Sequence, residues 1–117
     1  MKNLIILLAF SFSISSCTKE TMNTAPTMPS NFNISIGGTS ATYSWKASTD
    51  ADGDAIVYDI SVLDDAHSTP LVVATNVSTN SFISSTTPAN IPRTMIVTAK
   101  DGKGGTTTGV EQPGISL

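Results

Sequence analysis

The sequence contains a single cysteine, Cys17, and a single histidine, His67. One cysteine cannot form a disulfide within the chain, so a hydrophobic core has to stabilise the fold. His67 stands close to Asp64 and Asp65, but a metal site there would lack a second histidine or a cysteine as ligand. No serine lies in a Gly-x-Ser-x-Gly motif, and no motif pairs His67 with a nucleophile. Because these features are absent, we expect the protein not to be an enzyme.

Charged residues are also scarce. They make up 13% of the chain, and the formal net charge at pH 7 is -3. Nucleic-acid binding needs a concentration of lysine and arginine that neutralises phosphates, and the sequence shows no such basic surface. Serine, threonine, asparagine and glycine fill much of the chain instead, and they favour strands and turns over helices. We therefore expect an all-β domain without a nucleic-acid partner.

A long hydrophobic run is absent except at the N-terminus, where residues 4–12 form a short apolar segment behind Lys2. This pattern is typical of a signal helix, and it is too short to span a membrane comfortably. The segment ends in ISSC, which resembles the lipobox of bacterial lipoproteins. The resemblance implies cleavage after Ser16 and attachment of lipid to Cys17, with fatty acyl groups such as palmitate. Several acyl chains anchor a protein stably, because each buried methylene contributes about 0.8 kcal/mol.

These features divide the chain into three parts. Residues 1–16 are predicted to be a cleaved lipoprotein signal peptide, residues 17–29 a lipidated cysteine with a flexible tether, and residues 30–117 the folded domain. The tether is polar and lacks periodicity. Thr18 stands where lipoproteins kept in the inner membrane carry an aspartate, so the resemblance implies an outer-membrane lipoprotein of the cell envelope. It leaves open whether the domain faces the periplasm or the cell surface.

From Ser30 onward, short apolar alternations are separated by turn signals, as expected for about seven strands with one buried face each. Two sheets must pack against each other to bury these faces, so the sequence predicts an antiparallel β-sandwich. Tyr43, Trp45, Tyr58 and Val97 are predicted to lie in the core. The other residues expected to point inward are Phe32, Ile34, Ile36, Ala41, Ile56, Ile60, Val62, Phe82, Met95 and Ala99.

The order of these features resembles a fibronectin type III domain, or a related immunoglobulin-like domain, over residues 26 to about 111. The shared features are a proline-rich lead-in, Trp45 on the second strand, the loop ASTDADGD before Tyr58, and the hairpin VTAKDGKGGTTTG. The tyrosine usual at the start of the sixth strand is absent, since Arg93 stands there. The resemblance implies a module that contacts a partner protein through loops or an exposed edge strand. We also expect residues 111–117 to extend the last strand past a Pro-Gly break.

The segment STDADGDAIVYD places Asp50, Asp52 and Asp54 at alternate positions around one glycine. In an extended loop their carboxylates share one side, and calcium, which prefers about six to eight oxygen ligands, would offset their repulsion. The spacing is not that of an EF-hand, because Ala55 stands where that loop needs glycine. A sandwich would bring Asp101, in the DGKGG hairpin, to the same end. Calcium at these four aspartates is the only cofactor that the sequence suggests.

A simpler interpretation of the same loop is a tight turn. Aspartate and glycine supply the hydrogen bonds and conformations that tight turns use, and Lys103 in the facing hairpin offers a salt-bridge partner. Exposed aromatic residues would favour a carbohydrate partner, which stays possible, whereas those of this chain are predicted to point inward. We therefore expect a membrane-anchored, non-enzymatic module for protein–protein contacts. The alternatives are a calcium-dependent adhesion or glycan-binding module and a small envelope enzyme.

Overall fold

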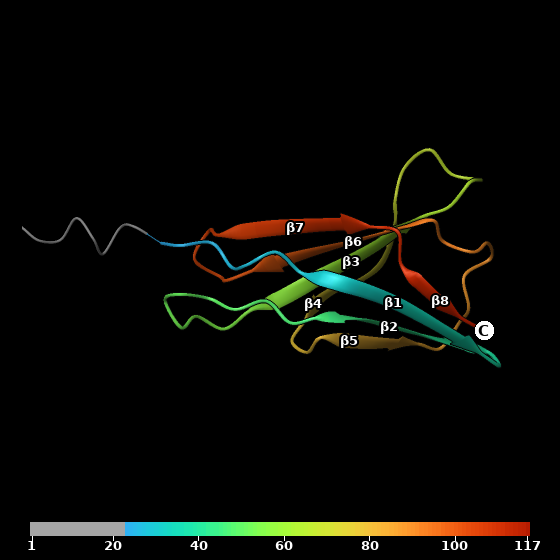
Figure 1. Ribbon diagram of the computed structural model, residues 1–117, viewed down its shortest axis with the longest axis horizontal. Coiled ribbons are helices and arrows are strands. Elements are labelled where there is room, and N and C mark those ends of the chain that lie inside the picture. The colour runs from blue at the N-terminus through green and yellow to red at the C-terminus, as the bar shows by residue number, and fades with distance from the viewer. Residues whose placement is uncertain (1–22) are drawn as a thin grey trace, which may run out of the picture.

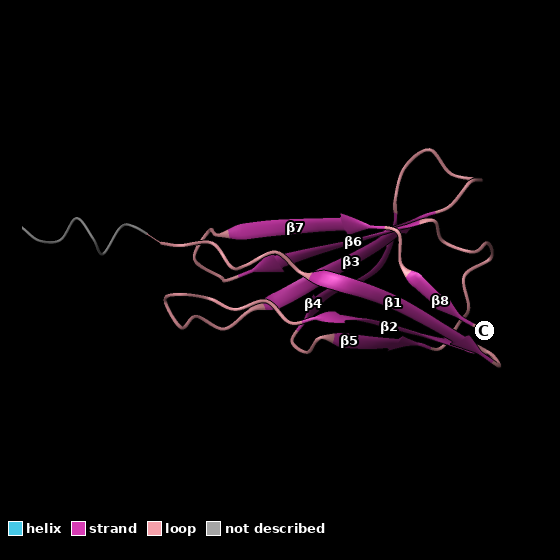
Figure 2. Ribbon diagram, in the orientation of Figure 1, coloured by secondary structure: helices cyan, strands magenta, loops and turns pink. Residues whose placement is uncertain are grey.

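The computed structural model describes residues 23–117, so the predicted signal helix, Cys17 and the first part of the tether lie outside the described residues. The described residues form eight β-strands in two sheets of four strands each (Figure 1; Figure 2). They include no helix that is long and apolar enough to cross a membrane. The fold is therefore the all-β, two-sheet sandwich that the sequence predicts.

The first sheet has the strand order β5-β2-β1-β8. Its strands are β1 (Ser30–Gly37), β2 (Ser40–Lys46), β5 (Ser81–Ser84) and β8 (Gly114–Ser116). The second sheet has the strand order β4-β3-β6-β7. Its strands are β3 (Val57–Leu63), β4 (Leu71–Val77), β6 (Thr94–Lys100) and β7 (Thr106–Glu111). All neighbouring strands pair antiparallel except β1 and β8, which are parallel.

The core lies between the sheets, because successive side chains of each strand point alternately toward the other sheet and toward solvent. Tyr43, Trp45, Tyr58 and Val97 are at most 4% exposed, as predicted. Trp45 on β2 and Tyr58 on β3 form an edge-to-face pair with ring centroids 5.2 Å apart, an arrangement that the charge distribution of aromatic rings favours. Phe82 on the short strand β5 is partly buried against this core.

The C-terminal strand differs from the expectation. Pro113 has no backbone N–H to donate, so β7 does not continue its ladder with β6 beyond Glu111. The chain crosses to the first sheet, where β8 pairs with residues 33–35 of β1. Glycine fits at the start of β8, because a Cβ on Gly114 would lie 2.6 Å from the side-chain oxygen of Asn33. The expected extension is thus a separate eighth strand in the opposite sheet.

The sandwich has two distinct ends (Figure 1). At one end the chain enters at Asn23, beside the β2–β3 loop (residues 47–56) and the β6–β7 loop (residues 101–105). We call this the acidic end. At the opposite end, β3 and β7 finish and β6 begins, and the loops of residues 64–70 and 85–93 extend beyond the sheets. We call this the distal end.

Candidate functional site

The β2–β3 loop gathers the three aspartates that the sequence singled out. One carboxylate oxygen from each of Asp50, Asp52 and Asp54 lies within 4.8 Å of the others. Asp50 Oδ1 accepts hydrogen bonds from the backbone N–H groups of Asp52 (2.9 Å) and Asp54 (3.2 Å). Gly53 adopts a φ of 75°, which glycine tolerates without strain. Among the described residues, Asp50 Oδ2 is buried and has no hydrogen-bond partner.

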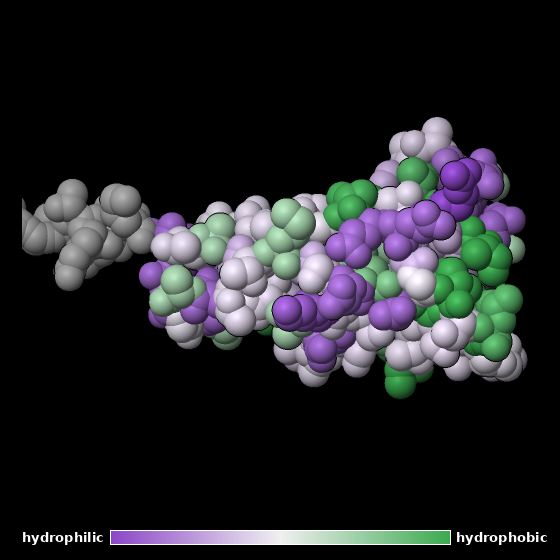
Figure 3. All heavy atoms as spheres, in the orientation of Figure 1, coloured by the Kyte–Doolittle hydropathy of each residue, from purple (hydrophilic) through white to green (hydrophobic). Residues whose placement is uncertain are grey.

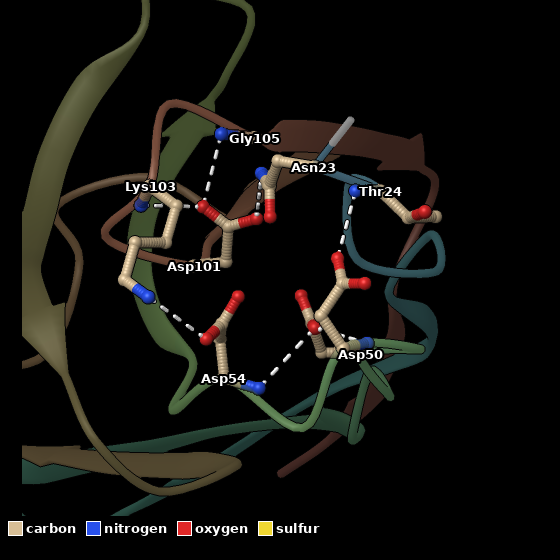
Figure 4. Close-up of polar contacts among 8 residues, drawn as sticks. Asn23, Thr24, Asp50, Asp54, Asp101, Lys103 and Gly105 are labelled. Carbon is tan, nitrogen blue, oxygen red and sulfur yellow. Dashed lines mark hydrogen bonds and ion pairs between the residues drawn. The ribbon is translucent and has the colours of Figure 1, made fainter. Parts of the chain in front are cut away.

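Asp101, the fourth predicted ligand, lies at the same end but outside this group of carboxylates (Figure 4). Its Oδ1 accepts hydrogen bonds from the backbone N–H groups of Lys103 (2.7 Å) and Gly105 (2.9 Å), and its Oδ2 accepts one from the Asn23 amide (2.7 Å). The bond from Asn23, supported by those from the backbone, keeps the pKa of Asp101 below its usual value, although burial acts in the opposite direction. Asp101 is thus an ionised acceptor that organises its own hairpin and holds Asn23.

Lys103 joins the two loops of the acidic end. Its Nζ lies 3.2 Å from Asp54 Oδ1, so it is the salt-bridge partner that the turn interpretation suggested (Figure 4). The Lys103 side chain is 64% exposed and that of Asp54 is 18% exposed. Because water and salt screen such a pair, it contributes little to the free energy of unfolding. A divalent ion at this loop would compete with Lys103 for the Asp54 carboxylate.

The lead-in, residues 23–29, packs onto the acidic end. The Thr24 N–H donates a hydrogen bond to Asp52 Oδ2 at 2.8 Å. Thr27 and Thr49 exchange two bonds, from the Thr27 N–H to the Thr49 carbonyl (2.9 Å) and from the Thr49 N–H to Thr27 Oγ1 (2.8 Å). The sequence predicts that these residues belong to the flexible tether. In the structure residues 23–29 are packed, because the two loops bind the polar groups of the lead-in.

The lead-in also contacts strand β7. Pro26 and Pro29 are buried, and the Thr107 hydroxyl donates a hydrogen bond to the Pro26 carbonyl at 2.6 Å. Gly109 permits this contact, because a Cβ at that position would lie 2.3 Å from the Pro29 carbonyl oxygen. Sequence reasoning missed the docking of the lead-in. The one sequence feature that could have indicated this docking is the pair Pro26 and Pro29, the proline-rich lead-in that resembles that of fibronectin type III domains.

His67 lies at the distal end and closes the loop that follows β3. Its Nδ1 lies 2.7 Å from Asp64 Oδ1, which also accepts a hydrogen bond from the Ala66 N–H at 2.9 Å. The hydrogen bond with His67 is the largest factor that keeps the pKa of Asp64 below its usual value. Within residues 23–117, the only group of three acidic, histidine or cysteine side chains spaced for a metal is the one in the β2–β3 loop.

Comparison with solved structures agrees with this architecture. The crystal structure of an Fn3-like protein from Clostridium thermocellum matches with a TM-score of 0.53 and 19% sequence identity, over 76% of this chain and 94% of that chain. No protein-family model matches the chain. No curated protein matches it either. The described residues are therefore an Fn3-like sandwich. Because such folds carry many functions, function has to be argued from the surface of this chain.

Proposed function

We propose that the protein is a lipid-anchored, non-enzymatic module that binds a partner protein in the bacterial cell envelope. The Fn3-like fold supports the binding role, and the lipobox-like ISSC motif supports the anchor at Cys17. Thr18 supports an outer-membrane address, on the resemblance described above. The work of such a module is done by its loops and sheet edges, since a sandwich of this kind buries the inner faces of both sheets.

The docking of the lead-in is the observation that carries this proposal. Asn23 is held at the acidic end by Asp101, and only six residue steps separate it from Cys17. A chain of that length spans at most about 20 Å. The acidic end therefore faces the lipid surface, and the distal end points away from it. A domain held with its acidic end toward the membrane presents its distal end to a partner.

The anchor is tested by replacing the lipidated residue. Cys17→Ala should move the protein from the membrane fraction to the soluble fraction, because no thioether can form. Thr18→Ala is the matched control, since it alters the neighbouring residue and leaves the cysteine, and it should remain with the membrane. Immunoblots of fractionated cells measure both. Unchanged membrane retention of Cys17→Ala would contradict the anchor.

The acidic loop supports a second candidate function, a calcium-dependent adhesion module. Three carboxylates lie within 4.8 Å of one another, and Asp50 Oδ2 is buried without a donor among the described residues. Calcium accepts carboxylate oxygens from flexible loops, and extracellular modules bind it at about 0.1–1 mM. Asp50, Asp52 and Asp54 would supply protein ligands. Asp101 is a poorer ligand, because both of its oxygens already accept hydrogen bonds.

Thermal unfolding with calcium and with chelator tests this second candidate. The mature chain carrying Cys17→Ser should unfold at a higher temperature in about 5 mM calcium, a concentration above the usual affinity of such modules. Asp54→Asn should remove the difference, whereas Asp65→Asn at the distal end should keep it. Equal midpoints with calcium and with chelator would rule out a calcium-dependent module.

No observation favours the glycan-binding alternative. Phe32, Tyr43, Trp45 and Tyr58 are buried, and Phe82 is partly buried. Residues 23–117 thus offer no exposed aromatic platform on which a sugar ring could stack. The described residues likewise show no arrangement of nucleophile, base and orienting group from which an enzymatic step could be built.

A further inference from the structure

A pocket of about 380 Å³ opens on the second sheet at its distal end. It forms where β3 ends, β6 begins and β7 ends. Its lining includes Leu63, Asp65, Arg93, Thr94, Val110 and Glu111. Because these residues come from three strands and two loops, no short sequence motif marks the pocket. Its volume accommodates one long side chain together with part of the backbone that carries it.

The lining combines an apolar surface with an acidic rim. Val110 is 60% exposed, although it is a large aliphatic side chain on a strand. Its cross-strand neighbour Ile96 is half-buried on the same face, and Leu63 at the end of β3 continues the apolar surface. Exposed apolar surface beside a hollow is suited to contact with the aliphatic part of another molecule.

The charges around the pocket are unbalanced. Asp64, Asp65 and Glu111 carry carboxylates, and Arg93 carries the only guanidinium of the lining. Arg93 already pairs with Asp65, at 2.6 Å, and Asp64 is bonded to His67. Within residues 23–117, Glu111 makes no ion pair. The rim therefore has an excess of negative charge, and Glu111 is the carboxylate available to a cation.

The tether of this chain cannot reach the pocket. The lead-in enters at the acidic end, and β3 spans the sandwich from Val57 near that end to Leu63 at the pocket. Seven residues of strand cover about 23 Å. The segment from Cys17 to Asn23 spans at most about 20 Å, and its lipid holds it at the membrane on the opposite side. The occupant is therefore a separate molecule that approaches from the side away from the anchor.

We propose that this pocket binds a lysine or arginine side chain of the partner protein. The aliphatic stem would lie on Leu63 and Val110, and the cation would meet the Glu111 carboxylate. Long basic side chains commonly bury their stems on apolar surface while their charged ends remain near water. The inference rests on the proposed function, because it names the surface and the chemistry by which the module would hold its partner.

Site-specific photo-crosslinking in intact cells tests the proposal. A benzophenone side chain is placed at Gln112 in the pocket lining, at Val72 on strand β4, or at Ala51 in the acidic loop. The partner should crosslink at position 112, through a peptide that contains a lysine or arginine. Replacing that residue by methionine, or Glu111→Gln in this chain, should lower the yield about tenfold, as expected for a lost charged hydrogen bond. Asp59→Asn, which removes an equal charge from strand β3 outside the pocket, should leave the yield unchanged.

Each other outcome has a distinct meaning. A crosslink at position 112 that Glu111→Gln does not weaken would overturn the role of the cation. Crosslinks only at positions 72 or 51 would overturn the pocket and leave the protein-binding function in place. No crosslink at any position would overturn both proposals. Val110→Lys provides a second variant, because its own cation would occupy the pocket and abolish the crosslink. Unchanged thermal midpoints establish that the variants are folded.

Discussion

The two ends of the sandwich use acidic side chains in different ways. At the acidic end, Asp52, Asp54 and Asp101 accept hydrogen bonds or ion pairs from the lead-in and from Lys103. At the distal end, Glu111 stands beside exposed Val110 without an ion pair to any described residue. The two ends also differ in hydropathy, because the most hydrophobic side chains of the visible face gather over its distal half (Figure 3).

The two ends show that a conspicuous sequence motif need not coincide with a surface that is free to bind a partner. The acidic loop attracts attention because its aspartates stand at alternate positions of one short segment, yet much of its hydrogen-bonding capacity is used within the chain. The distal pocket has no motif, yet its apolar groups and the Glu111 carboxylate remain open to a second molecule. If this comparison is correct, substitutions at the acidic end should mainly change stability and orientation, and substitutions at the distal pocket should mainly change binding.

The strongest test of the acidic end is Gly109→Ala. The added Cβ would lie 2.3 Å from the Pro29 carbonyl oxygen and 3.0 Å from Phe32 Cζ, so backbone has to move. We expect the free energy of unfolding to fall by about 2–3 kcal/mol, as for overpacked cores. Gly37→Ala is the control, because a Cβ there meets no atom within 4 Å. Urea unfolding measures both, and equal values would show that the lead-in is not clamped.

Asp101→Asn should have the next largest effect. Asparagine places an NH₂ group where Asp101 Oδ2 accepts the Asn23 amide, so the two donors would oppose each other. We expect the lead-in to detach and the amide hydrogens of Thr24 and Thr27 to exchange at least about tenfold faster. Asp65→Asn at the distal end is the control. Hydrogen exchange followed by NMR measures the exchange rates of these two amides. Unchanged rates would contradict the inference that Asp101 holds the lead-in through Asn23.

The same variant should alter the acid dependence of stability. The folded pKa of Asp101 lies below its unfolded value of 3.8. Ionised Asp101 therefore stabilises the native state above that value, and the stabilisation is lost as pH falls through the lower, folded pKa. The wild-type protein should lose more stability than Asp101→Asn on acidification below about pH 4. Parallel pH profiles of the thermal midpoint would contradict this assignment.

Tyr58→Phe should cost less. The Ser48 N–H, at the start of the acidic loop, donates a buried hydrogen bond of 2.9 Å to the Tyr58 hydroxyl. Without its acceptor the donor stays buried and unpaired, which should lower the free energy of unfolding by about 1–2 kcal/mol. Tyr43→Phe is the matched control, since Tyr43 is equally buried at 3% exposure and its hydroxyl bonds no described residue. Chemical denaturation distinguishes the two variants.

Lys103→Met should have the smallest effect. The pair with Asp54 is exposed to solvent on the lysine side, so its loss should change the free energy of unfolding by less than about 0.5 kcal/mol. Any change should disappear at high salt, because salt screens the pair. A larger, salt-independent change in denaturation would show that Lys103 holds the acidic end together more tightly than its exposure indicates.

Much of the fold could be predicted from the alternation of side chains. The inward positions of Tyr58 on β3 and Val97 on β6 follow from a period of two residues, and both are buried. The crossing of β8 to the first sheet could not be predicted in this way. It depends on a parallel pairing between Asn33 and Gly114, and a three-residue strand is too short to show periodicity.

The candidate site was predictable only in part. Asp50, Asp52 and Asp54 are neighbours in sequence, so their grouping follows from local geometry. The role of Asp101 in holding Asn23 could not be derived, because the two residues lie far apart in sequence and a single side-chain contact joins them. For the same reason, the distal pocket emerges only when the ends of three strands are placed together.

The docked lead-in also determines how the domain would respond to mechanical tension. A pull between the proposed lipid anchor and the proposed partner at the distal pocket would run lengthwise along the strands, from the lead-in to Leu63 and Glu111. The hydrogen bonds between strands lie across that direction, so the load would be shared by many bonds in shear instead of opening them one at a time. The contacts of Asn23, Thr24 and Thr27 would yield first, and their release would lengthen the tether while the sandwich remained folded.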